Sequence, residues 1–364
     1  MYFVNSLLPE NLHISAVFIG SVIMCWILLK IAVVTGKHIG LVDRPTERKN
    51  HRGEIPLVGG IGIFLTFLVL QAVSPASIAL IIAGSLLLSI GIADDYLDLN
   101  PKSRLLFQGI AAGVLVIGGG YQIVSLGSIF SAEVLILTGI VSVVFSVVCI
   151  IGVINAINMI DGADCLAGSI VSVSILALMI IAGFQAEINI PLISGLALLL
   201  GATLVFLVFN SGAMGITQKV FLGDSGSMFL GIVLASYFIG MSQGDNAPLS
   251  PVVAGWIFGL PLMDSVSVMV RRALSGKSPL SAGRDHLHHR LIDNGLSSAQ
   301  SVAIMLGLHV ILVAIGIIGN FYEFSNQMMF WSFVSMTVAY HFIAPIYASP
   351  ALLRVPRTNE QSVK

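Results

Sequence analysis

The sequence carries very little charge for its length. Only 10% of its 364 residues are Asp, Glu, Lys or Arg, whereas 56% are hydrophobic. Soluble domains average about 25% charged residues, so this composition excludes an ordinary soluble enzyme, and we expect no nucleic acid among the partners. Cysteine is also scarce, and the three cysteines show no spacing typical of a metal site or a disulfide framework. The chain is therefore expected to lie in a lipid bilayer.

Long hydrophobic runs fill most of the chain, and most have the roughly 17–25 residues that a membrane-spanning helix needs. The eleven runs cover about residues 14–36, 57–73, 77–93, 105–120, 133–153, 166–183, 191–209, 226–241, 252–270, 301–319 and 328–348. The first run lacks a basic segment before it and a cleavage site behind it, which favours a retained helix over a signal peptide. The sequence predicts an all-α polytopic membrane bundle of about eleven transmembrane helices, with residues 1–364 forming one integral-membrane domain.

The basic residues lie at alternate ends of these runs. All 17 Lys and Arg fall at or beyond one set of helix ends, whereas residues 1–13 and the opposite loops contain none. Because basic loops stay in the cytoplasm, this pattern predicts an amino terminus outside and a carboxyl terminus inside. Five polar segments then share the cytoplasmic side, at about residues 37–56, 94–104, 154–165, 210–225 and 271–300. We expect the functional site there.

Three carboxylates end the helix predicted over 77–93. Asp94 and Asp98 would share one helical face, while Asp95 turns toward its neighbour. Carboxylates at a helix C-terminus repel one another and the negative end of the helix dipole. A solvated loop start explains three of them poorly, whereas a cation would remove the conflict. An all-oxygen site suits Mg²⁺, or Mn²⁺, better than zinc.

The stretch "INAINMIDGADCLAG" at 154–168 brings polar residues into an apolar segment. Asn158, Asp161 and Asp164 recur every three residues, so a helix would carry them as one stripe. The stripe could face bulk cytosol, but its apolar neighbours keep it near membrane depth, where an unpaired carboxylate is costly. This favours a functional site.

Two further motifs supply groups for an anion. In "KVFLGDSGS", small residues around Asp224 leave backbone amides for an anion, and the carboxylate could take a cation that bridges to phosphate, although an ordinary helix cap is the alternative. In "GRDHLHHR", no cysteine accompanies the histidines, so we favour donors to phosphate over a zinc site. For the first cytoplasmic loop, a substrate role and purely topogenic or lipid-contacting charges both stay open.

Phosphoryl transfer typically uses carboxylates, a divalent cation and basic donors. Their expected position at a membrane boundary indicates transfer between a soluble phosphate compound and a lipid. The motifs "DRPTERKNHRGEIPLVGG", "DDYLD", "NAINMIDGADCLAG", "KVFLGDSGS" and "GRDHLHHR" occur in that order over most of the chain. In this the chain resembles the polyprenyl-phosphate N-acetylhexosamine-1-phosphate transferases. It looks most like the bacterial enzymes that move GlcNAc-1-phosphate from UDP-GlcNAc to undecaprenyl phosphate, release UMP and start cell-surface polysaccharide synthesis, such as O-antigen synthesis.

The resemblance implies roles for particular residues. Catalytic roles are implied for Asp94, Asp95, Asp161 and Asp164, and Mg²⁺ binding for Asp94, Asp95 and Asp224. Substrate-binding roles are expected for Asn158, Asn210, Lys219, Arg284, His286, His288, His289, Arg44, Lys49 and His51. The implied partners are a UDP-N-acetylhexosamine, undecaprenyl phosphate and the bilayer of the bacterial cytoplasmic (inner) membrane, and a homodimer is left open. One departure is Cys165, where relatives commonly have glycine; its side chain could narrow the nucleotide site or disturb helix packing.

Three alternatives deserve weight beside this interpretation. The lipid I-forming branch, the phospho-MurNAc-pentapeptide transferases, usually shows three consecutive histidines, whereas Leu287 interrupts them here. A secondary transporter would place its site near the bilayer midplane between repeats, but the acidic groups lie at one edge and no repeat is visible. A prenyl-chain enzyme using "DDYLD" would need a second acidic motif of the same form, which is missing.

Overall fold

The computed structural model describes residues 10–44, 53–72, 76–213, 218–279, 283 and 285–346. Its helices and strands run almost the full length of these ranges. They are α1 (Glu10–Ile39), β1 (Val42–Asp43), β2 (Ile55–Pro56), α2 (Gly59–Val69), η1 (Leu70–Ala72), α3 (Ile78–Leu97), α4 (Pro101–Gly113), η2 (Val114–Gly118), α5 (Gly139–Ile160), α6 (Leu166–Gly183), α7 (Ile190–Ser211), α8 (Gly223–Ser242), α9 (Pro251–Ile257), α10 (Gly259–Leu274), α11 (Leu287–Asp293), α12 (Ser298–Phe321) and α13 (Asn326–Ile346). The expected polytopic helical bundle is confirmed, with one short antiparallel strand pair added to it.

Several of the eleven hydrophobic runs form something other than one long helix. Within the described ranges, seven helices are long and apolar enough to span a membrane: α1, α3, α5, α6, α7, α8 and α12. The run at 252–270 is bent by 83° between α9 and α10, and counts as an eighth span if the pair crosses together. The run at 57–73 yields only the 11-residue α2 followed by a 3-10 turn. The count of eleven spans stays a prediction.

Helix starts follow local sequence signals. Ser77 and Asn100 cap α3 and α4 by accepting backbone amides three residues ahead, and proline occupies the first turn of α4. The Ser297 side chain and Gln300 form a reciprocal capping box at the start of α12. Side-chain caps of this kind satisfy amide groups that have no partner within the helix. The polar loops therefore also determine where the apolar helices begin.

Helix α8 lies at the centre of the bundle. About 89% of the apolar membrane-spanning stretch of α8 is buried inside the protein. The corresponding share for α1 is 28%, and several isoleucines of α1 are exposed. Backbones approach α8 closely: a Cβ built on Gly60 would lie 2.2 Å from the Cα of Gly226, and one on Gly91 would lie 2.2 Å from the Cα of Ser225. Small residues at these contacts let α2 and α3 pack directly on the start of α8.

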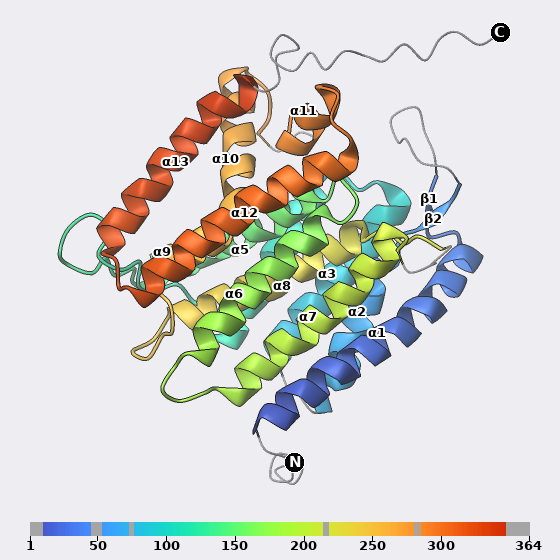
Figure 1. The fold of residues 1–364 in the computed structure, drawn as a ribbon, viewed down its shortest axis with the longest axis horizontal. Coiled ribbons are helices and arrows are strands. Elements are labelled where there is room, and N and C mark those ends of the chain that lie inside the picture. The colour runs from blue at the N-terminus through green and yellow to red at the C-terminus, as the bar shows by residue number, and fades with distance from the viewer. Residues whose placement is uncertain are drawn as a thin grey trace.

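Most of the long helices lie roughly along one common axis and run in both senses, so the bundle has two ends (Figure 1). α1, α7 and α13 begin at the lower-left end of the view, and α6 and α12 begin at the upper right. The upper-right end also holds the strand pair and α11. The chain thus brings the ends of α3 and α5 and the starts of α4 and α8 to the end where the polar segments meet.

Candidate functional site

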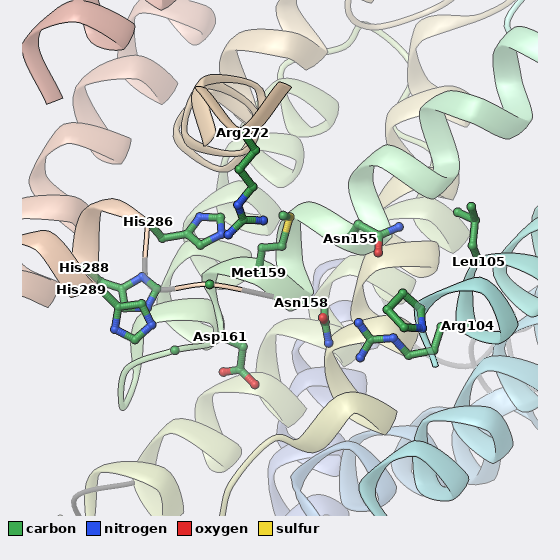
Figure 2. Close-up of a pocket in the computed structure, with 13 residues that line it drawn as sticks. Arg104, Leu105, Asn155, Asn158, Met159, Asp161, Arg272, His286, His288 and His289 are labelled. Atoms are coloured by element: carbon green, nitrogen blue, oxygen red, sulfur yellow. The ribbon is translucent and has the colours of Figure 1, made fainter. Parts of the chain in front are cut away.

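A pocket of about 280 Å³ opens at the polar end of the bundle, close to the lower limit of roughly 300–1,000 Å³ for small-molecule sites. Arg104 from α4, Asn158 from α5 and Asp161 from the α5–α6 loop line it on one side. Arg272 from α10 and the histidine motif line the other. Figure 2 shows the histidines across the pocket from Arg104. The sequence motifs at 154–168 and 283–290, far apart in the chain, therefore form one cavity.

The three histidines of the motif at 283–290, all predicted as substrate-binding residues, lie at this pocket. His286 and His288 are buried, and His289 lies beside them with ring centroids 4.0 Å from His288. Gly162 packs directly against the His288 ring, where a Cβ would lie 2.1 Å from Nε2. Because two arginines and three imidazoles surround the cavity, its chemistry suits an anionic ligand.

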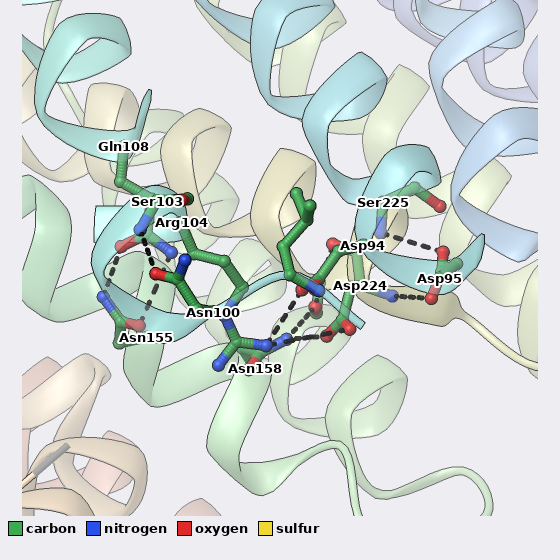
Figure 3. A network of polar contacts seen from close by, with 12 residues as sticks. Asp94, Asp95, Asn100, Ser103, Arg104, Gln108, Asn155, Asn158, Asp224 and Ser225 are labelled. Carbon is green, nitrogen blue, oxygen red and sulfur yellow. Dashed lines mark hydrogen bonds and ion pairs between the residues drawn. The ribbon is translucent and has the colours of Figure 1, made fainter. Parts of the chain in front are cut away.

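An acidic pair, Asp94 and Asp224, lies next to the pocket and beside Arg104 (Figure 3). Arg104 Nη1 is 2.9 Å from Asp94 Oδ2 and 3.9 Å from Asp224 Oδ2. Asn158 donates from Nδ2 to Asp224 Oδ1 and, at 2.9 Å, to Ser227 Oγ. The expected convergence of Asp94, Asn158 and Asp224 is therefore present. From the sequence, Arg104 counts only among the basic residues that set the orientation, although one of its partners, Asp94, lies ten residues before it.

Asp95 has a different position from Asp94. Its carboxylate accepts the backbone amides of Asp224 at 2.9 Å and Ser225 at 3.4 Å, at the start of α8 (Figure 3). The expectation that these amides are free for a phosphate is wrong, because a carboxylate from the neighbouring α3 already occupies the positive end of the helix. Asp95 thus ties α3 to α8 and fixes Asp224 beside Asp94.

Asp161 is a pocket carboxylate whose ionised form a cation would stabilise. It lines the pocket, and no hydrogen bond or ion pair to it is found in the described part of the chain. Burial raises the pKa of Asp161 well above its ordinary value, and neighbouring carboxylates, chiefly Asp224, raise it further. A divalent cation here would stabilise the ionised form.

The carboxylates of Asp161 and Asp224 suit Mg²⁺ better than a metal ion that takes all its ligands from protein side chains. In the described residues, no three His, Cys, Asp or Glu side chains are grouped so that they could hold a metal ion. Mg²⁺ usually keeps several waters and binds one or two carboxylates together with substrate phosphates. Asp161 and Asp224, adjacent to the cationic pocket, supply donors of that kind.

Asp164, Lys219 and Asn210 are brought together, but away from the pocket wall. Lys219 forms an ion pair with Asp164. Asn210 is buried, accepts the Cys165 amide at 2.6 Å and donates to the Val220 carbonyl at 2.8 Å. These contacts join the α5–α6 loop to the segment before α8. The structure therefore places three predicted substrate-binding or catalytic residues where they support the loop that carries Asp161.

Cys165 precedes α6 in a left-handed conformation, with φ +65°. Its sulfur is half-buried and faces the Leu207 carbonyl at 3.9 Å, and it does not line the pocket. The backbone conformation gives a physical reason for glycine at this position, since only glycine adopts it without strain. Narrowing of the pocket by the Cys165 side chain finds no support in this geometry.

The remaining predicted residues lie elsewhere or outside the described ranges. Arg44 pairs with Glu54 at 3.2 Å on the exposed side of the segments that flank the mostly buried strand pair, and it does not line the pocket. Lys49, His51 and Arg284 fall outside the described residues. Sequence reasoning also missed Arg272 in the pocket wall and Asp264, an acid inside a hydrophobic run that contacts His286. An ionisable residue within a membrane span is itself a signal of function.

Comparisons with known proteins agree with the motif pattern. Residues 77–242 match the family model for glycosyl transferase family 4. The chain is 34% identical over 324 residues to the undecaprenyl-phosphate alpha-N-acetylglucosaminyl 1-phosphate transferase of Escherichia coli K12, covering 88% of this chain and 86% of the relative. It is 33% identical to the protein of the same name from Haemophilus influenzae, covering 90% of this chain and 92% of the relative. The chain therefore belongs to glycosyl transferase family 4, with the polyprenyl-phosphate N-acetylhexosamine-1-phosphate transferases.

Proposed function

We propose that the protein transfers an N-acetylhexosamine 1-phosphate, with GlcNAc-1-phosphate as the first candidate, from a UDP-sugar to undecaprenyl phosphate. The products are UMP and a lipid-linked sugar diphosphate that starts cell-surface polysaccharide synthesis. The observation that carries the proposal is that Arg104, Asp161 and the histidine motif line one pocket at one end of an apolar bundle. That position suits a reaction between a soluble anion and a lipid phosphate, and the relatives bear the corresponding name.

The proposed chemistry is a direct displacement at phosphorus. An oxygen of the lipid phosphate forms a bond to the β-phosphorus of the UDP-sugar, and the bond from that phosphorus to the bridging oxygen breaks. The bridging oxygen and its electron pair leave with UMP. A phosphate monoester has its second pKa near about 6, so the nucleophile is largely ionised at neutral pH and needs little help from a base. The site's task is to position the two phosphates and to neutralise their charge.

The residues divide this task by their location. Arg272, His286 and His288 line the pocket as donors to diphosphate oxygens. Arg104 lines the pocket and also contacts Asp94 and Asp224, so its guanidinium can bind a phosphate in the pocket while it stays next to the two carboxylates. Asp161 and Asp224 would hold Mg²⁺, which would supply neutralisation of the diphosphate charge when bound.

The test is transfer by the purified protein in detergent with undecaprenyl phosphate, Mg²⁺ and a panel of UDP-sugars, following UMP release. The panel includes UDP-GlcNAc, UDP-GalNAc and UDP-MurNAc-pentapeptide, so preference for the last would identify the lipid I-forming branch. Asp224→Asn should abolish release, with Gly152→Ala on the exposed face of α5 as a matched control. No release with any sugar, combined with substrate-dependent flux in proteoliposomes, would indicate a transporter. A phosphosugar-enzyme adduct formed without lipid would replace direct attack with a two-step route.

The cellular location is part of the proposal. The charge distribution and the bacterial relatives favour a multi-pass protein of the cytoplasmic (inner) membrane with its pocket on the cytoplasmic face. The described α1 begins at the opposite end of the bundle from α11, whereas α13 ends at the same end as α11 (Figure 1).

A further inference from the structure

Asp264 is a buried carboxylate in α10 that the proposed chemistry does not use. Its exposed fraction is 2%. Ser267 and Arg271 follow it three and seven residues later, so the three side chains share one face of the helix. That face carries the polar contacts to the residues around the histidine motif, whereas most of the preceding run is apolar.

Three groups converge on this carboxylate, two from the start of α11 and one from α13. His286 Nδ1 lies 2.7 Å from Asp264 Oδ2. The Leu287 amide donates to Oδ1 at 3.2 Å, and the Tyr340 hydroxyl from α13 donates to the same oxygen at 2.8 Å. Asp264 thus joins α10, α13 and the start of α11 at one point.

The hydrogen-bond pattern fixes the state of the imidazole. The backbone amide can only donate, and an ionised carboxylate can only accept. A buried carboxylate with three such neighbours is satisfied as an anion when each of them donates, so Nδ1 of His286 carries a proton. Nε2 is then the ring nitrogen left for the pocket that His286 lines, and it donates to a phosphate oxygen when it carries a proton as well. A carboxylate in contact with one ring nitrogen commonly sets the tautomer and orientation of a functional histidine.

A second anchor holds the backbone beside this histidine but leaves its ring alone. The Asp285 carbonyl accepts from Arg271 at 3.2 Å and from Arg290 at 2.8 Å. The Asp285 carboxylate pairs with Arg272 Nε at 3.0 Å. These contacts involve only the preceding residue, so the side chain that hydrogen-bonds the His286 ring in the described part of the chain is Asp264, while the His288 ring lies nearly parallel to it with centroids 6.1 Å apart.

We propose that Asp264 is a positioning residue that holds the His286 ring with Nε2 toward the diphosphate of the nucleotide-sugar, and that its carboxylate stabilises the doubly protonated imidazole whose Nε2–H donates to a phosphate oxygen. The inference rests on the proposed function, since it deepens the role of the same pocket. The lipid phosphate is a separate substrate, so the effect of Asp264 should fall on the nucleotide-sugar. A purely structural carboxylate would instead affect stability and both substrates together.

The experiment is a double-mutant cycle of Asp264→Asn and His286→Ala in the full-length protein. Asp264→Asn should raise the KM for UDP-GlcNAc by about 10- to 100-fold, as for other carboxylates that orient a functional histidine, while the KM for undecaprenyl phosphate changes by less than about twofold. In the His286→Ala background the same substitution should change the UDP-GlcNAc KM by less than about twofold, because its effect passes through the histidine. Additive effects, or equal changes for both substrates, would overturn the proposal.

Two further variants separate charge, shape and stability. Asp264→Glu keeps the charge but changes the length, whereas Asp264→Asn keeps the shape but removes the charge. The Glu variant should lie closer to the wild type in UDP-GlcNAc KM, and it keeps the test decisive where the Asn variant fails to fold. Tyr340→Phe removes a donor to the same carboxylate without touching His286, so it should lower the melting temperature and leave the KM for UDP-GlcNAc unchanged. If the UDP-GlcNAc KM of the Asp264→Glu variant lies further from the wild-type value than that of Asp264→Asn, the result counts against Asp264 acting through His286. A raised UDP-GlcNAc KM in the Tyr340→Phe variant counts against it as well.

Direct binding distinguishes this inference from the proposed function. UDP-GlcNAc is titrated into the wild type and the Asp264→Asn variant in detergent, without the lipid substrate. Weaker binding in the variant, together with no transfer by the wild type, would refute the proposed function and support the positioning role. Transfer by the wild type with equal binding by both proteins would refute the positioning role alone.

Discussion

Cys165 shows how one residue can be chemically conspicuous without lying in the site. Its left-handed backbone conformation costs a non-glycine residue about 1–2 kcal/mol, and the extra chain entropy of glycine offsets roughly 0.5–1 kcal/mol of that cost. Cys165→Gly should therefore raise the free energy of unfolding by up to about 1 kcal/mol. The KM for UDP-GlcNAc should stay unchanged, because the side chain does not line the pocket.

The measurement is the apparent melting temperature in detergent together with steady-state kinetics. Burial, with the nearby Asp164 carboxylate, raises the pKa of the Cys165 thiol, so its removal should not eliminate a nucleophile. A lower melting temperature, or a changed KM, would return Cys165 to the nucleotide site.

Substitution of Asp161 should raise stability but lower activity, whereas substitution of Cys165 should raise stability and leave activity unchanged. Its pKa is raised in the folded protein, so the ionised form destabilises the fold, and stability falls as the pH rises from the unfolded value of about 3.9 toward the folded pKa. Asp161→Asn removes this penalty. In buffer without divalent cations, the variant should melt at a higher temperature than the wild type at neutral pH, and the difference should vanish near pH 4, about the unfolded value.

The same substitution should lower transfer by orders of magnitude, because the variant loses a carboxylate that would hold the cation. Added Mg²⁺ should stabilise the wild type more than the variant, which a melting series with and without EDTA measures. A variant that melts lower at neutral pH, or transfers at near the wild-type rate, would identify Asp161 as an ordinary solvated acid.

Sequence reasoning located the residues whose type is unusual for their surroundings. Asp161 and Asn158 stand out in an apolar helix, and both line the pocket. It could not identify partners that meet only in space: Asp95 occupies amides 129 and 130 residues ahead. Asn210, expected at the substrate, instead links two loops.

At the scale of helices, the start of α8 depends on backbone contact with α3. A Cβ on Gly91 would lie 2.2 Å from the Cα of Ser225, so Gly91→Ala must separate the two helices. Overpacking of this kind costs typically about 1–3 kcal/mol. Because α3 carries Asp94 and Asp95 and α8 carries Asp224, the same separation should reduce transfer, most visibly as a loss of kcat.

Gly152→Ala is the matched control for this prediction. Gly152 lies on the exposed face of α5, and nothing lies within 4 Å of a Cβ built there. Alanine at that position should leave transfer unchanged and leave the melting temperature at or above the wild-type value. Equal behaviour of the two alanine variants would mean that the α3–α8 contact is not tightly packed.

Hydrophobic runs predicted the helices but not their breaks. A run at 252–270 is apolar throughout most of its length, yet the chain bends by 83° at Phe258. Hydropathy measures how apolar a segment is, whereas a bend depends on the neighbours that pack against it. The bend has a functional consequence, since it gives α10 a direction that brings Asp264 and Arg272 to the histidine motif.

At the scale of the whole molecule, the bundle is chemically asymmetric. Ionisable side chains with defined partners gather at the end where α5 stops and α8 begins, as in the Arg104, Asp94 and Asp224 group. The other end carries short loops such as 184–189 and 243–250. A single-sided arrangement of this kind suits an enzyme at one membrane surface better than a transporter, whose site is reached from both sides.

The orientation of this asymmetric bundle can be tested by the accessibility of single engineered cysteines. Ser131 lies exposed between η2 and α5, and Lys277 lies exposed after α10, near the histidine motif. With the basic end in the cytoplasm, a membrane-impermeant maleimide should label Ser131→Cys in right-side-out vesicles and Lys277→Cys only in inverted vesicles. The unmodified protein gives the background, because Cys25 is buried and the other two cysteines are half-buried. Labelling with the opposite sidedness would place the pocket outside, where it could not draw on a cytoplasmic nucleotide-sugar, and would contradict the orientation and the proposed reaction together.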